Sequence, residues 1–205
     1  MKKILFLSIL ILLCARCSEK IENITNQGLP ELASVDELKS LLPAVLQSSG
    51  DKYAIYKDVN GAEQRIKISV SLEVETLGYG AEKYKREVLT ADYNSTNTNI
   101  TNGIRLLLSA NVYGDTEIKK AQGLSVGHIG HINPLGIDIA YDYAKKSISQ
   151  LSSSKLPSIQ LFNKTFTEVF ISDNADDALY KELRFNFKYG IVSFIGSDSK
   201  IYVFD

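Results

Sequence analysis

The sequence predicts a mainly β protein, a single antiparallel β-barrel or β-sandwich domain with a short N-terminal helix. Two observations carry this prediction. Apolar and polar residues alternate with a period of two in several segments, most plainly at 66–74 and 182–189. Turn-forming residues, such as Asn60-Gly61 and the stretch 196–199, separate the alternating segments. We expect eight to ten strands, a number that suits either a barrel or a sandwich.

The first 17 residues have the pattern of a secretory signal. Lys2 and Lys3 precede an apolar run from Ile4 to Leu13, and polar sequence begins at Ser18. The run is too short to cross a membrane as a helix, because a spanning helix needs about 20 apolar residues. Residues 1–17 are therefore expected to be a signal peptide, 18–33 a flexible tether, and 34–205 a single β-rich domain.

The end of the signal resembles the lipobox of bacterial lipoproteins, in which cleavage occurs just before a cysteine that carries the lipid. Cys17 is the expected lipidation site, because the polar tether starts directly after it, and Cys14 is the alternative. Arg16 departs from the small residue that usually precedes such a cysteine, and an ordinary signal peptide with chance cysteines is the remaining interpretation. The resemblance implies a lipid anchor in the outer membrane of the cell envelope, on its periplasmic or surface face.

Composition excludes several classes of function. Without residues 1–17 the chain keeps 20 basic and 24 acidic residues, a net charge of about −4, so the basic surface of a nucleic-acid-binding protein is absent. The spacing of Cys14 and Cys17 matches redox and zinc motifs, but it lies within the expected signal peptide. Neither a G-x-G-x-x-G nor a Walker pattern is present, and we expect no cofactor.

A short amphipathic helix is expected after the tether. Ser34 and Glu37 have the spacing of a capping box, in which the serine accepts a hydrogen bond from an amide near Glu37. Pro43 should kink the helix or split it in two, because proline lacks an amide proton. The apolar residues that recur at helical spacing, and that we expect to pack on the sheet, are Leu38, Leu41, Leu42, Val45 and Leu46.

Strands are expected over most of the remaining chain. The clearest hairpin joins 53–58 to 66–74 through a two-residue Asn60-Gly61 turn with positive φ. Residues 82–93 fit a strand or a helix, 94–102 a loop, and 137–151 a strand that passes into a short helix. The other expected strands are one at 103–114, which we expect to be the most buried strand, one at 166–171, and a C-terminal meander at 182–189, 191–195 and 200–204.

Both ends of the chain resemble small, uncharacterised lipoproteins of Bacteroidetes-type bacteria. The resemblance rests on the signal at 1–20, on the early hairpin Tyr56-Lys-Asp-Val-Asn60-Gly61, and on the segment from Phe187 to Asp205 with its aromatic final strand. It implies an envelope lipoprotein, and it supplies no catalytic residues.

Two motifs in the middle of the chain suggest chemistry. The segment Gly123-Leu-Ser125-Val-Gly127 matches the nucleophile elbow of α/β-hydrolases. Its context argues against that function: residues 117–122 do not resemble a buried strand, 128–134 cannot form a regular helix, and no histidine follows His131. The two histidines, His128 and His131, with Asp138 nearby, could hold a zinc or another divalent ion. A pair of ordinary loop histidines is the alternative interpretation.

The sequence favours a non-catalytic envelope lipoprotein that acts as a binding or structural module. The alternative is a metal-dependent or other hydrolase that uses the His128/His131 loop. The expected partners are a membrane, through the lipid anchor, and a small-molecule, glycan or protein ligand; nucleic acid is not expected. A glycan platform would be built on Tyr79, Tyr84 or Tyr93, whose positions are the least clearly internal.

Overall fold

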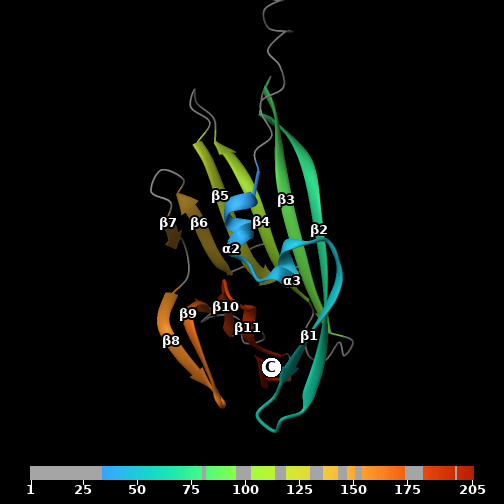
Figure 1. The fold of residues 1–205 in the computed structure, drawn as a ribbon, viewed down its shortest axis with the longest axis vertical. Coiled ribbons are helices and arrows are strands. Elements are labelled where there is room, and N and C mark those ends of the chain that lie inside the picture. The colour runs from blue at the N-terminus through green and yellow to red at the C-terminus, as the bar shows by residue number, and fades with distance from the viewer. Residues whose placement is uncertain are drawn as a thin grey trace, which may run out of the picture. The chain divides into compact units, whose positions relative to one another are not determined.

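The structure is a computed structural model that describes residues 34–79, 82–95, 103–113, 119–129, 136–142, 147–150, 154–173, 182–196 and 198–205. Close backbone contacts divide the chain into two units. Residues 33–75 and 86–205 form the larger unit, and residues 76–85 belong to the other unit together with the segment before residue 33. The fold described below is that of the larger unit (Figure 1).

The described residues form two short helices and twelve strands, which confirms the mainly β prediction. The helices are α2 (Asp36–Leu41) and α3 (Ala44–Gln47). The strands are β1 (Gly50–Lys57), β2 (Glu63–Tyr79), β3 (Glu82–Ser95), β4 (Ile104–Tyr113), β5 (Lys119–His128), β6 (Ile137–Asp142), β7 (Ser147–Gln150), β8 (Ser154–Leu161), β9 (Lys164–Asp173), β10 (Glu182–Asn186), β11 (Gly190–Ile195) and β12 (Ile201–Phe204).

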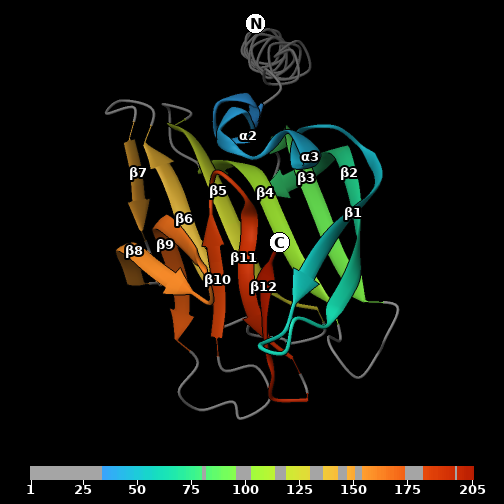
Figure 2. The same ribbon diagram turned by 60° about the horizontal axis from the view of Figure 1, so that its bottom comes forward.

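All twelve strands belong to one antiparallel sheet with the order β7-β6-β5-β4-β3-β2-β1-β12-β11-β10-β9-β8. Every neighbour in this order is also a neighbour in sequence, except that β1 pairs with β12. That junction is short: Tyr56 pairs with Phe204 and Lys57 with Val203. The Asp205 amide extends it by donating to the Ile55 carbonyl at 2.9 Å. The sheet therefore joins its first and last strands, and it is one curled sheet rather than a two-sheet sandwich (Figures 1 and 2).

One face of the sheet, called here the inner face, carries the main core. Its inner cluster combines residues from α2, α3, β1–β6 and β9–β12. Burial follows the alternation of the sequence: on β2, for example, Ile66, Ile68 and Val70 are buried whereas Arg65 is exposed. Leu38 of α2 and Leu46 of α3 are fully buried in the same cluster, as expected for helices that cover this face.

Two buried tyrosines connect distant strands through the backbone of one residue, Ile191. The Tyr56 hydroxyl on β1 donates to the Ile191 carbonyl at 2.8 Å, and the Tyr93 hydroxyl on β3 hydrogen-bonds to the Ile191 backbone. Burial raises the pKa of both phenols well above the usual range. Gly190, with φ +81°, precedes Ile191, and a Cβ there would lie 2.9 Å from the Tyr93 hydroxyl. A buried phenol that is hydrogen-bonded in this way fixes β11 against β1 and β3.

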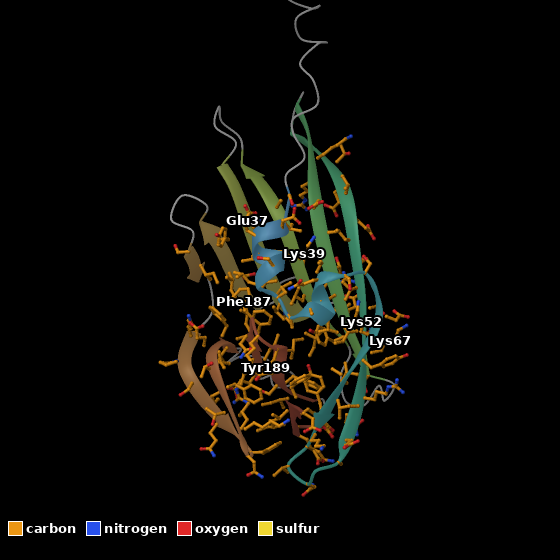
Figure 3. All side chains as sticks on the ribbon, in the orientation of Figure 1. Glu37, Lys39, Lys52, Lys67, Phe187 and Tyr189 are labelled. Carbon is orange, nitrogen blue, oxygen red and sulfur yellow. The ribbon has the colours of Figure 1, made fainter. Side chains whose placement is uncertain are left out.

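A second, outer cluster lies on the opposite face. It consists of Leu161, Phe166, Val169, Val192 and Val203, from β8, β9, β11 and β12. As a result β11 is buried on both faces, with Ile191 and Phe194 in the inner cluster and Val192 in the outer one. The prediction that 103–114 is the most buried strand was wrong among the described side chains. Only one face of β4 is buried, Arg105 on the other face is exposed, and β11 is the more completely buried strand. In Figure 3, the labelled Phe187 and Tyr189 follow β10; Phe187 packs on the inner cluster and Tyr189 on the outer.

The start of α2 is held by side chains from the sheet rather than by a capping box. Val35 is the N-cap, and Ser34 Oγ donates to the Glu87 carboxylate at 2.9 Å. Gln122 of β5 accepts from the Leu38 amide at 2.7 Å and donates to the Ser34 carbonyl and to the Glu37 carboxylate, both at 2.9 Å. Ser34 Oγ accepts from the Asp36 amide at 3.2 Å, so the serine binds an amide beside Glu37 as predicted. The arrangement differs from a capping box in that Val35 is the N-cap and the Glu37 carboxylate accepts from Gln122 on β5. The split at Pro43 is confirmed, because α2 ends before it and α3 begins after it.

Several local predictions are corrected by the structure. Residues 82–93 lie in a strand, and Ile148 lies in β7, paired with Tyr141, not in a helix. The meander is confirmed, but β10 ends at Asn186 because 187–189 form a turn. The loop predicted at 94–102 begins inside β3 and otherwise lies outside the described residues, and twelve strands exceed the eight to ten expected.

The β1–β2 connection is longer than the predicted two-residue turn. The Asp58 amide donates to the Ala62 carbonyl, so three residues form the loop, and only Gly61 has a positive φ, +79°. The buried Asp58 carboxylate accepts from the amides of Asn60 and Ala62, both at 2.9 Å. These hydrogen bonds lower the pKa of Asp58 and fix the turn.

Candidate functional site

The predicted metal ligands are described only in part. His128 ends β5, where its backbone pairs with Ile104, but its side chain and the whole of His131 lie outside the described residues. Asp138 lies on β6, and its Oδ1 accepts a hydrogen bond from Ser125 Oγ at 2.6 Å. Within the described ranges no group of three or more His, Cys, Asp and Glu side chains is placed to hold a metal ion. The metal site and the hydrolase that would use it stay predictions.

Ser125 does not lie on a nucleophile elbow. It occupies the middle of β5, paired with Leu107 of β4 and Asp138 of β6, so the chain continues as a strand on both sides of it. An elbow needs a sharp turn from a strand into a helix, which exposes the serine. The structure also corrects the view of the preceding segment, since Lys119 to Gln122 belong to this strand and Gln122 is fully buried.

The tyrosines proposed for a glycan platform do not form one among the described side chains. Tyr93 is 2% exposed and points into the inner cluster, so it offers no open ring. The side chains of Tyr79 and Tyr84 lie outside the described residues, as does Cys17. Tyr53 is 52% exposed, but the Arg65 guanidinium stacks 3.8 Å from its ring centroid and covers one face of it.

A concave site forms where three segments distant in sequence meet, and we call it the turn pocket. Its volume is about 240 Å³. The segments are the β1–β2 turn, the β8–β9 turn and the end of β12. The lining residues are Lys57, Asp58, Val59, Gly61, Leu161, Phe162, Asn163, Lys164, Val203, Phe204 and Asp205.

Packing on the outer face brings these segments together. Leu161 and Phe166 flank the β8–β9 turn and lie in the outer cluster with Val203 of β12. The β1–β12 pairing then places the β1–β2 turn beside the same strand. Figure 2 shows the end of the chain between β12 and β1. The pocket is therefore a consequence of long-range strand pairing.

Two lysines share one carboxylate in the turn pocket. Lys57 Nζ lies 2.7 Å from Asp205 Oδ2, and Lys164 Nζ lies 2.9 Å from Asp205 Oδ1. Hydrogen bonds from both ammonium groups lower the pKa of Asp205 to about 2, and the bond to Asp205 raises the pKa of Lys57. Lys164 Nζ also donates to the Phe204 carbonyl at 3.1 Å. Asp205 and Lys57 are therefore charged at neutral pH.

Apolar side chains at the two turns stand beside this ion network. Val59, in the β1–β2 turn, is 70% exposed, and Phe162, in the β8–β9 turn, is 39% exposed. Leu161 pairs with Lys164, so Phe162 and Asn163 form a two-residue hairpin loop. Phe162 has φ +52° at a position where glycine is favoured, and this backbone costs an L-residue about 1–2 kcal/mol.

Sequence reasoning missed the turn pocket. Its residues come from three segments that are separate in the sequence. One of them, β8, shows no clear alternation of apolar and polar residues, because most of its side chains are exposed and need not be apolar. One local signal was present in the sequence. Phe162 is a large aromatic residue in a turn next to Asn163, at a position where turns usually have a small or polar residue.

Comparison of the chain with protein-family models, with curated proteins and with solved structures gave no match. No helix in the described part of the chain is both long and apolar enough to pass through a membrane.

Proposed function

We propose that the chain is a non-catalytic lipoprotein of the cell envelope, anchored in the outer membrane through Cys17, whose β domain binds a small ligand in the turn pocket. The observation that supports binding is the combination of a 240 Å³ concavity, two ammonium groups and two exposed apolar side chains. Ligand sites usually combine an apolar lining with a few polar groups that fix orientation.

The chemistry of the lining favours binding over covalent catalysis. A lysine acts as a nucleophile when its pKa is lowered so that the neutral amine is available. Lys57 has a raised pKa because its ammonium group donates to Asp205 and to Glu63, so it remains protonated. The pocket residues are thus suited to hold a ligand by charge and apolar contact.

The anchor is tested by replacing each candidate cysteine in the full-length protein. Cys17→Ser should abolish acyl labelling and release the protein from the membrane fraction, whereas Cys14→Ser should leave both unchanged. Retained labelling in Cys17→Ser, with loss in Cys14→Ser, would move the anchor to Cys14. Retained labelling in the double variant Cys14→Ser/Cys17→Ser would refute an anchor at either cysteine.

The binding site is tested by titrating the purified protein with benzoate, benzylamine and benzyl alcohol, which share a ring and differ in charge. Backbone amide shifts should change at Gly61 and Asn163, which lie in the two turns. The amide of Ser109 on β4 is the reference and should not move. If none of the three probes at millimolar concentration shifts the turn amides, the proposed binding function of this pocket is wrong.

A further inference from the structure

The turn pocket holds both signs of charge, and the arrangement of these charges bears on the class of ligand. Building on the binding function proposed above, we infer that the pocket takes a small carboxylate with an apolar body, and that Asp205 competes with this ligand for Lys57 and Lys164.

The lysines have hydrogen-bonding capacity beyond their internal partners. An ammonium group carries three N–H donors. Lys57 contacts the carboxylates of Asp205 and Glu63, and Lys164 contacts the Asp205 carboxylate and the Phe204 carbonyl. One donor on each ammonium group is left over from these contacts. Because both groups lie within 3 Å of the same Asp205 carboxylate, their remaining donors can converge on a second one.

The internal charges of the pocket are balanced, so a ligand carboxylate must compete with an internal one. Two ammonium groups meet the Asp205 carboxylate, and Lys57 also lies 3.3 Å from Glu63, which is 62% exposed. The remaining carboxylate of the lining, Asp58, is occupied by the amides of its own turn and faces Lys200 at 3.5 Å. A bound carboxylate therefore gains the two ammonium groups by displacing Asp205, which is the competition inferred here.

The apolar body of the ligand is expected to contact the side chains of the two turns. Val59 and Phe162 are the exposed apolar residues of the lining, and the buried Leu161 and Val203 continue the same surface inward. The volume of about 240 Å³ lies just below the range of about 300–1,000 Å³ that is usual for ligand pockets. That space suits a ring or a short branched chain.

Asp205→Asn is the variant that separates this inference from its alternatives. If Asp205 competes with the ligand, removing its charge should tighten benzoate binding about fivefold, the scale of one exposed ion pair. Lys164→Met should weaken benzoate binding by about the same factor. Lys155→Met is the matched control and should leave binding unchanged, because Lys155 is also 43% exposed and also pairs with one carboxylate at 2.9 Å, on Glu168.

Phe162→Gly tests the use of the strained aromatic residue. Glycine adopts positive φ without strain, so this variant should melt no lower than the wild type. It should nevertheless weaken benzoate binding about fivefold or more, because the ring no longer contacts the ligand. Undiminished benzoate binding in Phe162→Gly would remove Phe162 from the site.

The three probes distinguish failure of this inference from failure of the proposed function. Binding of benzoate in preference to benzylamine and benzyl alcohol, tightened by Asp205→Asn, supports the inference. Preference for benzylamine, or weaker benzoate binding in Asp205→Asn, overturns the carboxylate class while the pocket remains a binding site. Absence of any response to all three probes overturns both.

Discussion

Gln122 offers the sharpest test of how the helices are attached to the sheet. It is fully buried on β5, on the same face of the strand as Leu124 and Val126 of the inner cluster. It forms hydrogen bonds with three groups at the start of α2. Gln122→Met preserves the length of the side chain and removes only its hydrogen-bonding atoms. The Leu38 amide, which is buried, then loses its partner.

The expected cost is about 2 kcal/mol. An unsatisfied buried amide costs about 1–3 kcal/mol. The Ser34 carbonyl and the Glu37 carboxylate lose less, because Ser34 is partly exposed and Glu37 is exposed, so water replaces the amide. In a chain of this size 1 kcal/mol corresponds to about 2–4 °C in melting temperature, so Gln122→Met should melt about 4–8 °C lower.

The measurement is urea and thermal unfolding of wild type and variant, followed by far-UV circular dichroism. Gln160→Met on the exposed face of β8 is the control and should change the unfolding free energy by less than about 0.5 kcal/mol. If Gln122→Met unfolds like Gln160→Met, the hydrogen bonds at the start of α2 contribute nothing to stability and this account of the helix attachment is wrong.

Three further predictions concern the C-terminal half of the sheet. Tyr93→Phe should lower the unfolding free energy by about 1–3 kcal/mol, because the buried Ile191 backbone loses its hydroxyl partner; equal stability in urea would contradict this. The pKa of Asp205 is lowered to about 2 from 3.8, so its stabilising effect is fully present above pH 3.8 and is lost as pH falls through about 2. The stability difference between wild type and Asp205→Asn should shrink over that interval in acid unfolding, and a constant difference would rule out the Lys57–Asp205–Lys164 network as its source. A chain ending at Gly190 lacks Ile191, Phe194 and Tyr202 of the inner cluster and should show no cooperative melting, so a wild-type melting curve would refute the role of the meander.

Local patterns in the sequence were enough to predict the fold class and many of its elements. The alternation at 66–74 and at 182–189 gave real strands, and Pro43 split the helix as its chemistry requires. Errors arose where a tertiary contact overrode a local preference. Ser34 accepts from a helix amide as its spacing predicted, but its hydroxyl also donates to the Glu87 carboxylate on β3. Gln122 on β5 accepts from the Leu38 amide, a contact that no local pattern indicated.

The candidate site was beyond sequence reasoning for a different reason. Lys57, Lys164 and Asp205 look like ordinary surface charges in the sequence, and only the β1–β12 pairing and the outer cluster bring them to one point. The sequence context already argued against a nucleophile elbow at Ser125, and the residue lies inside the strand β5. The His128 and His131 prediction is not tested by the described side chains.

The pairing of β12 with β1 also imposes an order in time. Each of the other strand pairs can form as soon as two consecutive segments have been synthesised, but Tyr56 must wait for Phe204. Until then β1 keeps an open edge, and the inner cluster lacks Tyr202. For the exported lipoprotein proposed above, the sheet thus stays incomplete until residue 204 has been synthesised, and an incomplete sheet is easier to thread through a membrane pore.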